Sequence, residues 1–215
     1  MLNVAISAAQ KGGEVLARYF DEVGLERELK DDKNFASKAD SESEEAIVTE
    51  IKKHFPDHGF LGEEGSDENT DAKYLWVIDP LDGTKNFLNG IPIFAVSVAL
   101  VKDASPVAAV VYNPVTRSLY VAEKGSGTTY NGKRVTVSKQ RAEMGVVTFG
   151  PGQKDKETLN RFFERSETFF KSKRYLGCTA LELGYVARGG TEGFVCIGLK
   201  KWDYAAGTLL VKEAG

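Results

Sequence analysis

The sequence has few cysteines and few histidines. Its 215 residues include two cysteines, Cys178 and Cys196, and two histidines, His54 and His58. Two cysteines are too few for a zinc motif or a disulfide framework. Free thiols are typical of proteins in a reducing cytoplasm, and most of them are small buried side chains. The composition therefore predicts a cytoplasmic protein without structural disulfides.

The sequence also lacks long apolar runs and an excess of basic residues. Its longest apolar stretches, such as 94–101, are far too short to span a bilayer, and its start lacks the pattern of a signal peptide. The formal net charge of -3 argues against a dedicated nucleic-acid binder, because neutralising phosphates needs clustered Lys and Arg. Length and composition predict one large soluble domain or two fused halves, with neither membrane nor nucleic acid as a partner.

Hydrophobic periodicity predicts a mixture of helices and antiparallel strands. Apolar residues at helical spacing predict a first helix over 2–20, in which the glycines at 12 and 13 indicate close packing. The capping-box pattern from Ser41 to Glu44 predicts a second helix over 42–54. Strands are predicted at 74–78, 94–100, 107–112, 118–122, 127–130 and 194–199, and further helices at 154–167, 179–187 and 203–214. This order favours an α+β fold of layered sheets and helices.

The strongest functional signal is segment 79–84, which reads Asp-Pro-Leu-Asp-Gly-Thr. The proline keeps Asp79 extended, so its carboxylate is expected at the end of a strand. The Asp82-Gly83 pair favours a tight turn that brings both carboxylates to one side. Paired carboxylates are suitable ligands for Mg²⁺, which prefers oxygen donors. These six residues alone leave a plain turn after a strand as an equal alternative.

Three weaker acidic signals accompany this segment. Segment 62–65 reads Gly-Glu-Glu-Gly, which by itself is typical of a solvated loop. Asp203 stands at the start of segment 203–214, and Asp40 lies just ahead of the predicted second helix. Helix capping is the ordinary role of an aspartate in either position.

Taken together, these motifs resemble a known family. Segments 62–64, 79–87 and 202–207, in this order and spacing, strongly resemble the inositol monophosphatase family, and the resemblance extends from the first helix to Gly215. It implies a layered α/β/α/β/α sandwich of the sugar-phosphatase type. We expect an N-terminal half, 1–145, with most metal ligands and a C-terminal half, 146–215. Because family members usually continue for some tens of residues, the resemblance implies either a natural short form or a fragment that lacks part of the C-terminal half.

The resemblance implies an activity and a set of residues for it. The activity is magnesium-dependent hydrolysis of a small phosphate ester by metal-activated water, in proteins that are commonly homodimers. The residues that match the family's ligands for two or three Mg²⁺ ions are Glu63, Asp79, Asp82, Asp203 and the carbonyl of Leu81. The residues that match its catalytic positions are Thr84, Asp40 and Glu63, with Thr84 and Asp40 orienting and deprotonating the water. The residues that match its substrate-binding positions are Gly83, Thr84, Gly177, Cys178 and Thr179.

Two positions bear on the substrate. Inositol-specific members often carry a glutamate where this sequence has Cys196, and a thiol is a weaker hydrogen-bond acceptor. Asn89 often reads His in those members, and the surrounding stretch is similar to the archaeal branch that also accepts fructose 1,6-bisphosphate. The expected substrate is therefore inositol monophosphate, with or without fructose 1,6-bisphosphate. The alternatives are 3′-phosphoadenosine 5′-phosphate, histidinol phosphate, or a non-catalytic regulator that keeps the fold.

Overall fold

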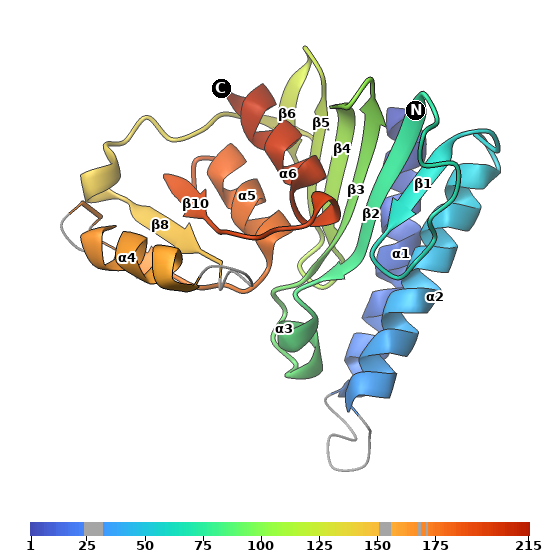
Figure 1. The fold of residues 1–215 in the computed structure, drawn as a ribbon, viewed down its shortest axis with the longest axis horizontal. Coiled ribbons are helices and arrows are strands. Elements are labelled where there is room, and N and C mark those ends of the chain that lie inside the picture. The colour runs from blue at the N-terminus through green and yellow to red at the C-terminus, as the bar shows by residue number, and fades with distance from the viewer. Residues whose placement is uncertain (24–31, 151–155, 167–168, 171) are drawn as a thin grey trace.

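A seven-stranded sheet lies at the centre of the fold, and a three-stranded sheet lies beside it in the computed structural model (Figure 1). The structure describes residues 1–23, 32–150, 156–166, 169–170 and 172–215. Two helices cover the outer face of the large sheet, two helices fill the space between the sheets, and one covers the small sheet (Figure 1). The predicted α/β/α/β/α layering of an α+β fold is therefore confirmed.

The large sheet is a meander whose strands follow one another in chain order. Its strands are β1 (Gly59–Gly62), β2 (Tyr74–Asp82), β3 (Ala95–Lys102), β4 (Ser105–Asn113), β5 (Ser118–Glu123), β6 (Gly127–Tyr130) and β7 (Lys133–Val135). β1 runs parallel to β2, and all later neighbours are antiparallel. The strands predicted between positions 74 and 130 are confirmed, because alternating or continuous apolar residues mark them.

The end of β2 differs from the expectation. Asp79 and Pro80 lie inside the strand, which continues to Asp82 and shifts its register against β3 between Asp79 and Asp82. This irregularity accommodates a proline, which cannot donate a hydrogen bond to a neighbouring strand. A short helix, α3 (Thr84–Leu88), then follows Gly83, whose φ of 94° is in the left-handed region that favours glycine.

Helices α1 (Leu2–Val23) and α2 (Asp32–Lys52) pack against each other and against the outer face of the large sheet. The first helix is confirmed. The predicted start of the second helix near position 42 is wrong, because α2 already begins at Asp32, and the predicted capping box from Ser41 to Glu44 lies within it. The buried face of α2 carries polar residues there, so apolar periodicity does not mark its first half.

Helices α5 (Thr179–Ala187) and α6 (Lys201–Ala214) cover the other face of the large sheet. The predicted range of α5 is confirmed. In α6, the residue at the N-cap is Lys200, and Asp203 is the third residue of the helix. The expectation that Asp203 would stand at the N-cap is therefore wrong by three positions.

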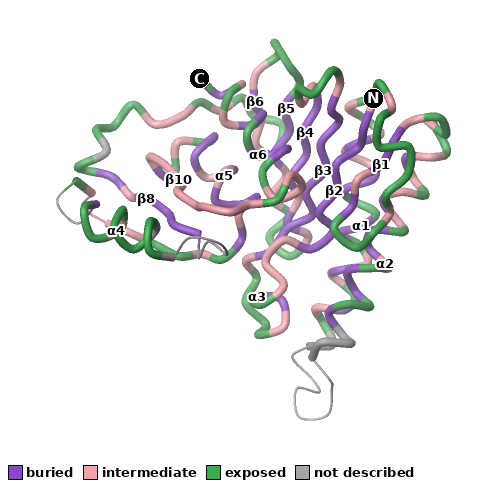
Figure 2. Tube along the Cα trace, viewed as in Figure 1, coloured by how far each residue is buried: buried purple, intermediate pink, exposed green. Residues whose placement is uncertain are grey.

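The hydrophobic core has one part on each face of the large sheet. Residues of β2 alternate between them, with Trp76 and Ile78 facing α1 and α2, and Leu75 and Val77 facing α5 and α6. Figure 2 shows the buried residues concentrated along β2 to β5 and on the helix faces toward them. No helix in the described ranges is both long and apolar enough to cross a membrane.

The small sheet consists of parallel strands in the order β10-β8-β9. Its elements are β8 (Val146–Phe149), β9 (Ser172–Arg174) and β10 (Gly193–Val195), with α4 (Lys156–Ser166) packed beside β8 and a 3₁₀ turn, η1 (Ala142–Met144), before it. The predicted buried strand over 194–199 is shorter than expected, and its residues are only half-buried. The predicted helix over 154–167 is confirmed in α4, although part of that range lies outside the described residues. The expected division of the chain at 145/146 falls just before β8 and stays a prediction.

The close approach of α1 and α2 depends on Gly12. A Cβ atom at this position would overlap the side chains of Ile47 and Ser43. Gly12→Val is therefore expected to reduce the free energy of unfolding by about 1–3 kcal/mol, as overpacking in other cores does. The measurement is the melting temperature beside that of Gln10→Val, an exposed site on the same helix. Equal melting temperatures for the two variants would show that the helices do not need this glycine.

Candidate functional site

Three carboxylates from distant parts of the chain meet beside the large sheet. Glu63 follows β1, Asp79 lies in β2, and Asp203 lies in the first turn of α6. Each side chain offers one carboxylate oxygen, and these three oxygens all lie within 4.8 Å of one another. Carboxylate oxygens are the protein ligands that Mg²⁺ and other hard cations prefer. The structure thus brings together three of the four acids expected to bind metal, and their chemistry fits a hard divalent ion.

Burial and mutual repulsion raise the pKa values of the acids in this cluster. Asp79 is almost completely buried, and burial followed by repulsion from Asp82 and Glu63 raises its pKa well above the ordinary value. Glu63 is an exposed residue, so the protein desolvates its carboxylate only in part, yet this desolvation and repulsion from Asp203 raise its pKa to about 7. Burial also raises the pKa of Asp203. The backbone N–H of Lys200, which donates a hydrogen bond to this carboxylate, lowers the pKa but does not cancel the effect of burial. A bound cation would relieve this repulsion.

Asp82 lies next to the cluster but is held by another element. Its Oδ2 atom accepts a hydrogen bond from the backbone N–H of Ala180 at 2.5 Å and one from the Cys178 thiol at 3.2 Å. Burial raises its pKa to about 6, although the Ala180 N–H favours the ionised form. The carboxylate therefore caps the N-terminus of α5 from outside the helix, and its role as a metal ligand stays a prediction.

The residues around Asp82 form a chain of short contacts. The backbone N–H of Leu81 donates to Asp79 Oδ1 at 3.1 Å, and the Thr84 hydroxyl donates to the carbonyl of Leu81 at 3.1 Å. This carbonyl is the one expected to bind metal. The site of Gly83 is crowded, because a Cβ atom there would press against Ile93 and Phe94. The roles expected for Leu81, Gly83 and Thr84 stay predictions.

Asp40 lies within α2 rather than ahead of it, and its side chain is buried. Burial, followed by repulsion from Glu64 and Glu63, raises its pKa to about 9. The carboxyl group is therefore neutral at pH 7 in the metal-free protein, and the Thr84 hydroxyl is directed to Leu81 instead. A divalent ion at the acid cluster would lower the pKa of Asp40 by offsetting the charge of Glu63.

The loop before α5 contains the residues expected to contact the alcohol part of a substrate. Gly177 has a φ of 74°, and Cys178 is buried with its thiol toward Asp82. Burial raises the pKa of this thiol well above its ordinary value, so it is an unreactive hydrogen-bond donor. Contacts of Gly177, Cys178 and Thr179 with a substrate stay predictions.

Sequence reasoning missed two residues that hold parts of the site. Asn86 donates through Nδ2 to the carbonyls of Ile93 at 2.8 Å and Leu176 at 2.7 Å, so it ties α3 to the loop before α5. Glu44, which the sequence places in a capping box, accepts hydrogen bonds from the loop after β1. A signal for Glu44 exists in the sequence, because it is one turn from Asp40 and one turn from Ile47 on the same helix face.

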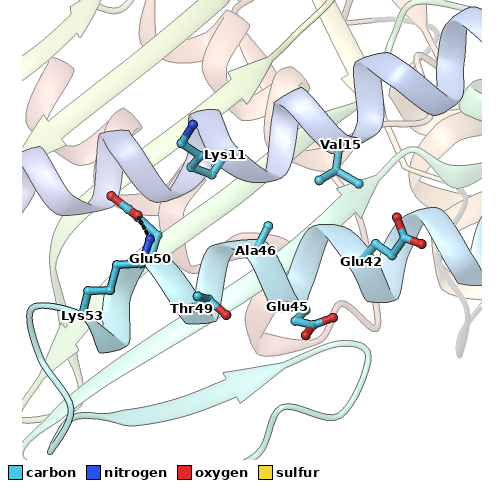
Figure 3. Close-up of a pocket in the computed structure, with 8 residues that line it drawn as sticks. All are labelled: Lys11, Val15, Glu42, Glu45, Ala46, Thr49, Glu50 and Lys53. Atoms are coloured by element: carbon cyan, nitrogen blue, oxygen red, sulfur yellow. Dashed lines mark hydrogen bonds and ion pairs between the residues drawn. The ribbon is translucent and has the colours of Figure 1, made fainter.

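A groove of about 500 Å³ lies between α1 and α2 on the outer surface. The residues that line it are Lys11, Val15, Glu42, Glu45, Ala46, Thr49, Glu50 and Lys53 (Figure 3). None of the acids described above lines this groove. It is therefore separate from the candidate site.

The chain matches proteins of known family over its whole length. The model of the inositol monophosphatase family matches residues 1–215. The inositol-1-monophosphatase of Rhizobium meliloti (strain 1021) is 42% identical over 223 residues, which cover 100% of this chain and 83% of that protein. A fructose-1,6-bisphosphatase/inositol-1-monophosphatase of Aquifex aeolicus is 43% identical, with the same two coverages. The Nus factor SuhB of Escherichia coli (strain K12) is 38% identical, again with 100% and 83% covered.

A solved structure agrees with these matches. The extragenic suppressor protein SuhB of Bartonella henselae superposes with a TM-score of 0.89 at 40% identity, covering 99% of this chain and 84% of that one. The layered α+β fold is thus that of a phosphatase family. The chain belongs to the inositol monophosphatase family.

Proposed function

We propose that the chain is a magnesium-dependent phosphatase that hydrolyses a small phosphate monoester. The observation that carries this proposal is the convergence of Glu63, Asp79 and Asp203 at one point. Three mutually repelling carboxylates reduce the stability of the metal-free fold, whereas hard cations would bind them favourably. A purely structural role does not require this arrangement.

In this proposal, the acid cluster holds the metal and its neighbours handle the substrate. Bound Mg²⁺ would supply an activated water and would stabilise the charge that develops on the phosphoryl group. Glu63, Asp79 and Asp203 hold the ions, and Asp82 contributes through Oδ1, because Oδ2 is taken by the first turn of α5. Thr84 would orient the water. Asp40, ionised once a bound cation lowers its pKa, would take the proton of the Thr84 hydroxyl as that hydroxyl accepts one from the water. The backbone amides of Gly83 and Thr84 bind the phosphate.

The names of similar proteins support a substrate class. The Rhizobium protein is named for inositol monophosphate, and the Aquifex protein is named for both inositol monophosphate and fructose 1,6-bisphosphate. Cys196 in place of a glutamate reduces polar recognition of a single polyol. We therefore propose activity on both esters, in a cytoplasmic homodimer.

The test is phosphate release from four esters with and without magnesium. The panel contains inositol 1-phosphate, fructose 1,6-bisphosphate, 3′-phosphoadenosine 5′-phosphate and histidinol phosphate. We expect turnover of the first two that requires Mg²⁺ and stops when EDTA is added. A folded chain that releases no phosphate from any ester with Mg²⁺ present would refute the proposal.

A regulatory role is the second candidate, and the name of the Escherichia coli relative, Nus factor SuhB, favours it. In that case the acid cluster would be dispensable for the regulatory function. Variants that abolish phosphate release while keeping the fold would then leave that function intact.

A further inference from the structure

The loop that carries Glu63 is attached to α2 through one buried side chain. Glu44 lies on the buried face of α2, and only 4% of its residue surface is exposed. Its Oε2 atom accepts a hydrogen bond from the backbone N–H of Glu64 at 3.1 Å, and its Oε1 atom accepts one from Ser66 at 2.9 Å. A single carboxylate thus binds the backbone directly after Glu63. Hydrogen bonds to a charged acceptor are about twice as strong as neutral ones.

The start of this loop is shaped to admit the Glu44 carboxylate. Gly62 immediately precedes Glu63, and a Cβ atom on Gly62 would overlap both the carboxylate of Glu44 and the hydroxyl of Ser66. Gly62 has an ordinary negative φ, so the glycine is needed for space and not for an unusual backbone conformation. Gly62 and Glu44 therefore form one packing unit.

The same face of α2 also contacts the strand that carries Asp79. Ser43, next to Glu44, donates through its hydroxyl to the carbonyl of Pro80 at 3.3 Å. Asp40, one turn earlier, is buried close enough to Glu63 and Glu64 for their charges to raise its pKa. One turn of α2 therefore contacts both segments that supply acids to the cluster.

We propose that Glu44 is a positioning residue, which fixes the loop after β1 so that the Glu63 carboxylate meets those of Asp79 and Asp203. The inference rests on the proposed function in one respect, namely that Glu63 binds metal. Residues that orient metal ligands typically contribute about 10–100-fold to metal affinity. Glu44 does not touch the metal or the substrate in this role.

The variant Glu44→Gln tests the role with little change in volume. The glutamine offers one carbonyl oxygen in place of two carboxylate oxygens, and its amide group would face a backbone N–H. We expect the dissociation constant for Mn²⁺, measured by electron paramagnetic resonance, to rise about 10–100-fold. The Mg²⁺ concentration for half-maximal phosphate release should rise by a similar factor, while kcat at saturating Mg²⁺ approaches that of the parent.

Glu45→Gln is the matched control. It makes the same change in charge on the next residue of α2, whose side chain lines the outer groove (Figure 3). Its Mn²⁺ affinity and Mg²⁺ dependence should equal those of the parent. If Glu44→Gln binds Mn²⁺ as tightly as Glu45→Gln does, Glu44 does not position Glu63 and the inference is overturned.

Amide hydrogen exchange decides the inference separately from the proposed function. In the metal-free protein, at least one of the backbone N–H groups of Glu64 and Ser66 should exchange at least about tenfold faster in Glu44→Gln than in Glu45→Gln, because the glutamine offers one acceptor oxygen for the two amides. Gly62→Ala should accelerate the same two amides without removing any charge. If the parent protein binds no Mn²⁺, the proposed function fails. Independently of that result, unchanged exchange at the amides of both Glu64 and Ser66 in Glu44→Gln would reject the role of Glu44.

Discussion

Asp82→Asn is expected to lower kcat/KM for phosphate release by about 10³-fold, which corresponds to about 4 kcal/mol of transition-state stabilisation. The substitution removes one negative charge beside the acid cluster and places an amide at a site expected to bind cations. The asparagine oxygen still accepts the hydrogen bond from Ala180, so the cap on α5 is kept. The measurement is the initial rate of phosphate release over a range of ester and Mg²⁺ concentrations.

A surface Asp→Asn substitution serves as the control, because it distinguishes the effect of losing a charge at the site from the effect of losing a charge elsewhere on the protein. Asp71 lies in an exposed loop between β1 and β2, and Asp71→Asn should leave the rate unchanged. Circular dichroism of Asp82→Asn should match that of the parent. Near-parental activity of a folded Asp82→Asn protein would remove Asp82 from the proposed ligand set.

The parts of the fold that were predictable are those whose burial is mostly apolar. Strand β3 follows from large apolar residues that alternate with smaller ones, β4 follows from a continuous apolar run, and α5 follows from a mostly apolar segment. The early start of α2 was not predictable in this way, because Asp40, Ser43 and Glu44 occupy the buried face where apolar residues are expected. Strands β8 and β9 of the small parallel sheet were also missed, since they have only four and three residues and give little periodicity.

The identity of the clustering acids could be predicted, but their local positions could not. The motif resemblance selects Glu63, Asp79 and Asp203, and the structure brings these three together. Local rules place Asp79 after its strand and Asp203 at a helix cap, whereas they lie within β2 and at the third position of α6. Tertiary contacts decide such details, because Asp82 and Glu44 bind backbone groups that are distant in sequence.

The melting temperature of the metal-free protein is expected to fall as the pH rises from 7 to 9. Burial is the largest cause that raises the pKa of Asp40 to about 9, of Glu182 to about 8 and of Glu63 to about 7. In the unfolded chain these acids titrate near their ordinary values of about 4, so the folded state binds more protons throughout this range. The free energy of unfolding therefore decreases with rising pH, by about 1.4 kcal/mol per pH unit for each proton retained by the buried Asp40 and Glu182, and by less for the solvent-exposed Glu63.

The stabilisation that these acids contribute is complete below their pKa values in the unfolded chain. It is lost as the pH rises through their pKa values in the folded protein. His58, whose pKa burial lowers, has the opposite effect only below its ordinary value of 6.5, outside the range considered. A decrease of roughly 5–10 °C is expected for a chain of this size. Asp40→Asn should make the decrease shallower, because the asparagine has no proton to lose.

Magnesium should oppose the loss of stability by binding the ionised cluster. An ion at about 100 times its dissociation constant adds about 2.7 kcal/mol to the free energy of unfolding. The melting temperature should therefore rise most at pH 9, where the acids already carry their charges and the repulsion among Glu63, Asp79 and Asp203 is greatest. Scanning calorimetry across this pH range, with EDTA and with Mg²⁺, measures both effects. A melting temperature that stays constant or rises with pH in EDTA would mean that these acids are already ionised in the fold, and that a cation is not needed to hold them together.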